Sequence, residues 1–226
     1  MDTPLTIRTI AAGHWLREGI RRGLKGLDEI EDVVRSIIDD VRNRGDKAVR
    51  DYTERFDGAE SVPSSAEVTS SEIRRAYSLV DDSVTEALRR AADNIERFHE
   101  RQVQQSWTCI LDDGTQMGQV IRPLERVGLY VPGGTAAYPS SVLMGAIPAR
   151  VAGVSQVIAC TPPSPGGVAN PYVLVAADIA GVDRVFKAGG CQAIAAMALG
   201  TDSICAVDKI VGPGNAYVTA AKKLVF

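Results

Sequence analysis

The chain has 226 residues, of which 45% are hydrophobic and 23% charged, and its formal net charge is −3. This is the composition of a globular protein, long enough for one large domain or two small ones. The absence of a basic surplus and the low aromatic content argue against a nucleic-acid-binding protein. The uncharged stretch 151–177 is interrupted by Gly and Pro, so it does not predict a membrane span.

The start of the chain and its cysteines bear on the compartment. The run Met1-Asp-Thr-Pro4 lacks the basic start and apolar core of a secretion signal. The four cysteines form no C-x-x-C pattern, which is usual in a reducing environment. We therefore expect a cytoplasmic protein that works without a membrane.

Charge is distributed unevenly along the chain. Of its 53 charged residues, 38 lie in the first 106. A solvated helical region followed by a region with a buried sheet would give this distribution. We therefore divide the chain into a mainly helical part, residues 1–110, and an α/β part, residues 111–226.

The first predicted helices follow one another closely. Apolar residues recur at helical spacing over 28–44, which predicts a helix that ends at Gly45. Asp46 is then placed to cap a second helix that runs through Phe56.

Two further helix starts carry the capping-box pattern, at 69–72 and 83–86, and the second of these helices is expected to reach about Arg101. The many Arg and Glu residues of these helices favour a solvated scaffold. The two histidines, His14 and His99, are interpreted as surface or helix-end residues, because no cluster with metal-ligand spacing surrounds them.

The second part begins with a predicted hairpin over residues 107–122, whose turn is Asp112-Asp-Gly114. Strands and helices then alternate, which predicts a mainly parallel sheet with right-handed crossovers. Pro148 is expected to kink or end the first of these helices. The strands are predicted at 126–131, 154–160, 183–187 and 208–211, and the helices from about 140, at 171–180, at 191–199 and after 215.

Three of the strands end in Gly-rich turns that open helices. These turns contain Pro132-Gly-Gly-Thr135, Ala188-Gly-Gly-Cys-Gln192 and Gly212-Pro-Gly-Asn215. In a parallel sheet such turns line one crevice, and the helix N-termini behind them suit phosphate. They predict a nucleotide cleft, although neither a complete G-x-G-x-x-G nor a Walker sequence is present.

Three polar side chains stand at these turns. Tyr130 could pack on a base or ribose, or be a half-buried strand aromatic. Gln192 could bond ribose hydroxyls or a nicotinamide carboxamide, or cap its helix. Asn215 could bond a ligand or cap a helix. Cys160 and Cys191 also lie near the predicted cleft, but without a neighbouring base they are interpreted as buried structural thiols.

Several long runs closely resemble histidinol dehydrogenases, in order along nearly the whole chain. One departure is Cys191, where that family more often has Ala. The runs are Arg44-Gly-Asp-Lys-Ala-Val49, Tyr52-Thr-Glu-Arg-Phe-Asp57, Asn94-Ile-Glu-Arg-Phe-His-Glu-Arg-Gln102, Val127-Gly-Leu-Tyr-Val-Pro-Gly-Gly-Thr-Ala136, Pro139-Ser-Ser-Val-Leu-Met144, Phe186-Lys-Ala-Gly-Gly-Cys-Gln-Ala-Ile-Ala-Ala196 and Val207-Asp-Lys-Ile-Val-Gly-Pro-Gly-Asn-Ala-Tyr-Val218.

The resemblance implies an incomplete Rossmann-like, three-layer α/β/α domain, similar to that of aldehyde dehydrogenases, which binds NAD rather than NADP. It aligns Tyr130, Gln192 and Asn215 with the residues that contact NAD in the family. Backbone at Pro132 to Gly134 and at Gly212 to Gly214 is expected to contribute. The first helices acquire a possible role in the packing of a homodimer.

The family's chains are about twice as long as this one, and the resemblance stops at Phe226, so we interpret the chain as a truncated, NAD-binding half. The resemblance implies that the intact protein oxidises L-histidinol through L-histidinal to L-histidine, with zinc and a proton-moving Glu-His pair held by the missing half. On that reading the 226 residues alone are inactive. Two alternatives stay open: a zinc- and NAD-dependent dehydrogenase of another small polar alcohol, and a short, non-catalytic nucleotide-binding module.

Overall fold

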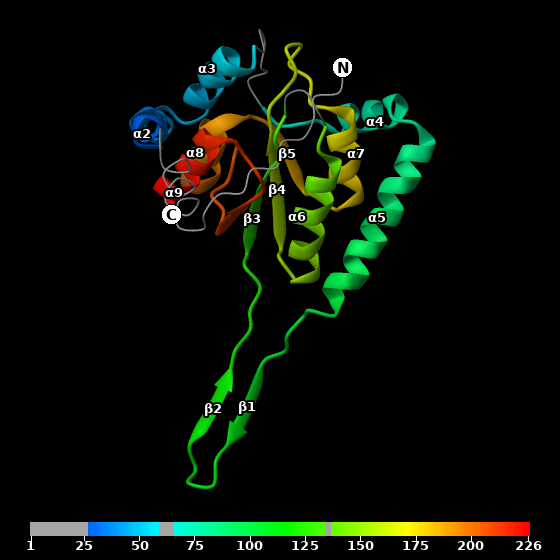
Figure 1. Ribbon diagram of the computed structural model, residues 1–226, viewed down its shortest axis with the longest axis vertical. Helices are drawn as coiled ribbons and strands as arrows, with labels where there is room; N and C mark the ends of the chain where they lie inside the picture. Colours follow the sequence, from blue (N-terminus) through cyan, green and yellow to red (C-terminus); the bar gives the residue numbers. More distant parts are fainter. Residues whose placement is uncertain (1–26, 59–65, 134–136) are drawn as a thin grey trace, which may run out of the picture.

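The computed structural model describes residues 27–58, 66–133 and 137–226. Its centre is a four-stranded parallel sheet in the order β5-β4-β3-β6 (Figure 1). The strands are β3 (Arg126–Tyr130), β4 (Gln156–Thr161), β5 (Arg184–Lys187) and β6 (Lys209–Val211). The helices are α2 (Leu27–Arg44), α3 (Asp46–Asp57), α4 (Ser70–Leu79), α5 (Asp82–Glu100), α6 (Pro139–Val151), α7 (Pro171–Ile179), α8 (Gly190–Leu199) and α9 (Ala216–Val225).

Successive side chains of a strand point to opposite sides of a sheet. Both faces of this sheet carry apolar side chains, and helices cover both. On one face, Leu129, Ala159 and Val185 pack with residues of α4, α5, α6 and α7. On the other, Ile158 and Phe186 pack with residues of α2, α3, α8 and α9. The predicted three-layer α/β/α fold is confirmed (Figure 1).

The helices of the N-terminal region take part in both layers. α2 and α3 lie on α8 and α9, whereas α4 and α5 lie on α6 and α7. The division of the chain at residue 110 stays a prediction. None of the helices in the described ranges is long and apolar enough to cross a bilayer.

Most element boundaries match the sequence-based expectations within two residues, including the capping box at the start of α4. There the Thr69 hydroxyl accepts a hydrogen bond from the Glu72 N–H at 3.2 Å, and Glu72 Oε2 accepts one from the Thr69 N–H at 2.8 Å.

Two predicted helix caps were wrong. Asp46 is the first residue of α3 rather than its cap, and its carboxylate accepts hydrogen bonds from the Ser203 N–H and hydroxyl at 3.0 and 2.7 Å. Ser83 lies inside α5, because Asp81 already has the extended backbone of an N-cap residue and Asp82 begins the helix. At Asp46 a long-range partner took the place of the local one, whereas α5 begins earlier than its capping-box pattern indicated.

Of the two predicted effects of Pro148, a kink or the end of its helix, the second is wrong: α6 continues to Val151. Proline cannot donate a hydrogen bond from its own nitrogen, and its ring crowds the carbonyl of residue i−4, but the bonds that follow it can still form. The Pro148 carbonyl still accepts from the Ala152 N–H at 2.9 Å, and α6 is held between α5 and α7. Tertiary packing therefore carries the helix one turn past the proline.

The predicted hairpin is confirmed as β1 (Trp107–Ile110) and β2 (Gln116–Gln119), which pair antiparallel. Gly114 has a φ of 85°, the left-handed conformation that this turn requires. Every residue of the two strands is exposed. Figure 1 shows the hairpin extending well away from the sheet and its helices, and we call residues 107–119 the hairpin arm.

Candidate functional site

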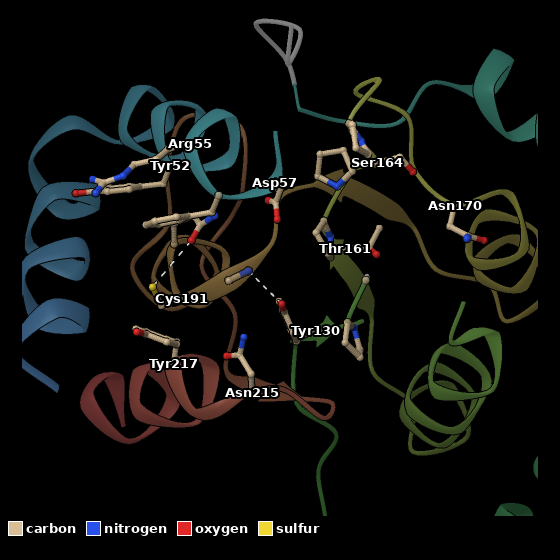
Figure 2. Close-up of a pocket in the computed structure, with 18 of the residues that line it drawn as sticks. Tyr52, Arg55, Asp57, Tyr130, Thr161, Ser164, Asn170, Cys191, Asn215 and Tyr217 are labelled. Atoms are coloured by element: carbon tan, nitrogen blue, oxygen red, sulfur yellow. Dashed lines mark hydrogen bonds between the residues drawn. The ribbon is translucent and has the colours of Figure 1, made fainter. Parts of the chain in front are cut away.

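A cavity of about 830 Å³ lies at the carboxyl end of the sheet. The turns after β3 and β5 contribute to its wall, as predicted, and of the third predicted turn Asn215 contributes; the turn after β4 and one face of α2 and α3 complete the wall (Figure 2). Its volume is within the range of small-molecule sites, about 300–1,000 Å³. The three residues singled out in the sequence, Tyr130, Gln192 and Asn215, all line it.

Tyr130 ends β3 and is only 5% exposed. Its hydroxyl accepts a hydrogen bond from the Gly190 N–H at 3.0 Å, so its polar end already has a partner at the start of α8 (Figure 2). Burial raises the pKa of the phenol, which stays neutral. The ring therefore positions α8 and offers the cavity mainly an apolar surface.

Gln192 lies in the first turn of α8, and its side chain is fully buried. Its Oε1 atom lies 4.0 Å from the Cys191 sulfur, a weak contact, and its Nε2 has no hydrogen-bond partner among the described residues. The side chain folds back over Gly190, where a Cβ would lie 2.5 Å from Oε1. An unpaired buried amide costs about 1–3 kcal/mol, so the nitrogen calls for an acceptor that the described protein does not supply.

Asn215 is the N-cap of α9, and its Oδ1 accepts a hydrogen bond from the Val218 N–H at 3.0 Å. The capping alternative is therefore realised. Capping uses only the oxygen, and Figure 2 shows the amide nitrogen directed into the cavity. One side chain can thus cap α9 and donate to a ligand.

Only some of the backbone segments predicted to contribute are found in the cavity wall. Pro132 and Gly133 line the cavity, while Gly134 lies outside the described residues. The residues Gly212 to Gly214 are not part of its wall. Gly212 has a φ of 113° and a Cβ there would lie 2.0 Å from the Tyr130 carbonyl oxygen, so this glycine is needed for the close approach of β6 to β3.

Helix α3 contributes a wall that the sequence-based interpretation as a solvated scaffold did not anticipate. Tyr52, Arg55, Phe56 and Asp57 all line the cavity. The Tyr52 and Phe56 rings are stacked with centroids 5.7 Å apart, and the Arg55 guanidinium lies 5.3 Å from the Phe56 ring centre. The aromatic residues at i and i+4 near a helix end were the available signal.

Asp57, the last residue of α3, is the acidic group of this wall. Its Oδ2 atom is buried and has no hydrogen-bond partner among the described residues. A Cβ on Gly189 would lie 3.0 Å from that oxygen, so the carboxylate sits against the start of α8. Burial raises the pKa of Asp57 to about 6.

The two cysteines near the cavity are inert by their surroundings. Burial raises the pKa of Cys160 to about 12 and that of Cys191 to about 11. Both thiols are therefore protonated at neutral pH, and no nucleophile is available from them. This agrees with their interpretation as buried structural residues.

His99 lies near the end of α5, where its Nδ1 is 2.7 Å from Gln102 Oε1, remote from the cavity wall. His14 lies outside the described residues. Within the described ranges no three His, Cys, Asp or Glu side chains gather closely enough to hold a metal ion.

The sequence matches the family model described as histidinol dehydrogenase over residues 20–226. A histidinol dehydrogenase of Heliobacterium mobile is 53% identical over 224 residues, which are 98% of this chain and 51% of that protein. One of Clostridium acetobutylicum is 54% identical over 198 residues, 88% of this chain and 46% of that protein.

The crystal structure of histidinol dehydrogenase from Elizabethkingia anophelis superimposes with a TM-score of 0.83 at 42% identity, covering 87% of this chain and 45% of that one. The chain thus spans about half the length of the relatives it matches.

Proposed function

The chain belongs to the histidinol dehydrogenase family, and from that premise we propose that it forms the NAD-binding part of an enzyme that oxidises L-histidinol through L-histidinal to L-histidine in the cytoplasm. Two NAD⁺ would be needed for this reaction, because each would take up one hydride. The substrate and this four-electron reaction come from the family. The residues of the cavity supply the argument for NAD.

The observation that carries the proposal is the unpaired amide of Gln192. A nitrogen donor buried behind the Gly-rich turn at the start of α8 is stabilised when a ligand brings it an acceptor. The nicotinamide carboxamide and the ribose hydroxyls are such acceptors. Asn215, across the cavity on α9, adds a second amide donor.

Bound NAD would supply the hydride acceptor, and the residues of this chain would hold and orient it. Tyr130 fixes the backbone of Gly190, which in turn fixes the side chain of Gln192. The turn Thr161-Pro162-Pro163 forms another side of the cavity. We assign zinc binding and proton transfer to a part of the protein beyond this chain, and we expect the intact protein to be a homodimer.

Isothermal titration of NAD tests the cofactor part of the proposal. Gln192→Met keeps the shape of the side chain but removes the amide, so we expect an affinity at least about tenfold weaker with an unchanged or higher melting temperature. Gln156→Met is the matched control, because Gln156 lies at the amino-terminal end of β4 and outside the cavity wall, and it should bind like the wild type. Equal affinity in Gln192→Met and wild type would contradict the assignment of this cleft.

Turnover tests the division of labour. We expect the isolated 226-residue chain to produce no NADH from L-histidinol. A rate typical of enzymes, about 1 s⁻¹ or more, would show that the catalytic groups lie within it. Absence of NAD binding altogether would instead leave a scaffold without a nucleotide site.

A further inference from the structure

The one carboxylate among the described residues of the cavity wall comes from a helix rather than from the end of a strand. Of the described residues in this wall, only Arg55 and Asp57 are charged, and both belong to α3. Strand β4 ends in Thr161 without an acid. The wall at the carboxyl ends of β4 and β5 therefore receives its negative charge from a helix outside the sheet, as Figure 2 shows for Asp57.

The negative charge of Asp57 affects where in the cavity a phosphate can bind. A helix N-terminus is normally a place for phosphate. At α8, however, the Gly190 N–H is bonded to the Tyr130 hydroxyl, and the Asp57 carboxylate lies against Gly189. A phosphate at this point would meet a like charge. The pyrophosphate of a dinucleotide therefore fits better in a part of the cavity away from Asp57, and a neutral, donor-rich group fits against Asp57.

The neighbours of Asp57 on α3 indicate which neutral group this is. The ring of Phe56 is 52% exposed and stacks on Tyr52, so this aromatic pair offers an apolar surface at the rim of the cavity. A purine packs well on such a surface. The sugar attached to that purine would then reach the adjacent residue, whose Oδ2 lacks a donor.

We propose that Asp57 accepts hydrogen bonds from the hydroxyls of the adenine-bearing ribose and thereby makes the cleft select NAD against its 2′-phosphorylated form, NADP. This inference rests on the proposed NAD site. A carboxylate holds a ribose diol and repels a phosphate at the 2′ position. Here the carboxylate comes from α3 rather than from the end of the second strand.

The test measures the dissociation constants of NAD, NADP and 2′-deoxy-NAD for wild type and Asp57→Asn by isothermal titration, at neutral pH and constant ionic strength. In wild type we expect NAD to bind at least about tenfold more tightly than either analogue. Asp57→Asn removes the charge and keeps the shape. The ratio of the NADP dissociation constant to the NAD dissociation constant should therefore fall by about tenfold or more.

Glu54→Gln is the matched control, because Glu54 is exposed on the same helix, loses the same charge and does not line the cavity. It should leave the ratio unchanged. A ratio that is unchanged in Asp57→Asn, or a wild type that does not discriminate, overturns the inference while the NAD site stands. If wild type binds no NAD, the proposed function fails as well. Circular dichroism melting shows that each variant is folded.

Discussion

At the scale of single residues, the Tyr130 hydroxyl explains why the start of α8 has a fixed shape. In Tyr130→Phe the Gly190 N–H loses its partner in a partly buried setting, and the free energy of unfolding should fall by about 1 kcal/mol. Urea denaturation measures this. Tyr138→Phe, at an exposed position, is the control. A loss in Tyr130→Phe no greater than in the control would show that the hydrogen bond contributes nothing net.

Asp57 gives stability a pH dependence of definite sign. Its pKa of about 6 in the fold exceeds the ordinary 3.8, so between about pH 4 and 6 the folded state binds the proton more strongly. This contribution to stability is complete at low pH and is lost as pH rises through about 6. Asp57→Asn should therefore melt at a higher temperature than wild type at pH 7.5, and the difference should disappear near pH 4.

Thermal melts across that pH range, with Glu54→Gln in parallel, decide the matter. An advantage of Asp57→Asn that is the same at every pH, or absent at pH 7.5, would contradict the buried, unpaired carboxylate. The predicted sign also fits a binding role, because a residue that lowers the stability of the unliganded fold is typical of functional sites.

These residues mark what sequence reasoning reaches at this scale. Tyr130, Gln192 and Asn215 could be placed in one cleft because the ends of parallel strands meet at one edge of a sheet. Asp57 could not, because its approach to Gly189 depends on how α3 packs on α8, a contact between residues far apart in the chain. The hydrogen bond between the Gly190 N–H and the Tyr130 hydroxyl could not be predicted for the same reason.

At the scale of elements, an ion pair between the buried Lys187 and the partly exposed Glu72 links α4 to the sheet. The Lys187 ammonium, 4% exposed at the end of β5, lies 2.8 Å from Glu72 Oε1, and the other oxygen of Glu72 closes the capping box of α4. Glu72→Ala leaves the lysine charge buried and opens the cap, so we expect a loss of about 3–5 kcal/mol. Lys187→Met buries an apolar chain and leaves only a partly exposed carboxylate, so its cost should be much smaller.

Chemical denaturation of both variants provides the comparison, with Glu86→Ala, an exposed residue of α5, as the control. Equal losses in Glu72→Ala and Lys187→Met would contradict a penalty that arises from the unpaired lysine. The capping box of α4 could be predicted from the sequence because its two partners, Thr69 and Glu72, are three residues apart. The caps at Asp46 and Ser83 were not, since Asp46 found a long-range partner in Ser203 and α5 began earlier than its local pattern indicated.

At the scale of the whole molecule, the layered fold followed from the alternation of strands and helices, whereas the placement of the first four described helices did not. α2 and α3 lie on one face and α4 and α5 on the other, although all four have similar charged, amphipathic sequences. The same packing turns the N-terminal region into part of the cleft, through α3.

The hairpin arm leads to the last prediction, which rests on the proposed homodimer. Trp107 and Met117 lie on one face of the arm and are 50% and 47% exposed, and the arm itself stands clear of the body in Figure 1. Apolar side chains on an isolated two-stranded ribbon indicate a surface that another chain covers. In a double variant, Trp107→Thr with Met117→Thr, we expect the intact protein to elute as a monomer with an unchanged melting temperature of the core.

Light scattering coupled to size-exclusion chromatography gives the mass directly. Ile110→Thr changes the opposite face of the same strand and should leave the mass as in wild type. A double variant that remains dimeric would place the dimer contact elsewhere, and a monomeric wild type would remove the homodimer from the proposal. Because the arm contacts little of the body, a change in mass without a change in stability separates assembly from folding.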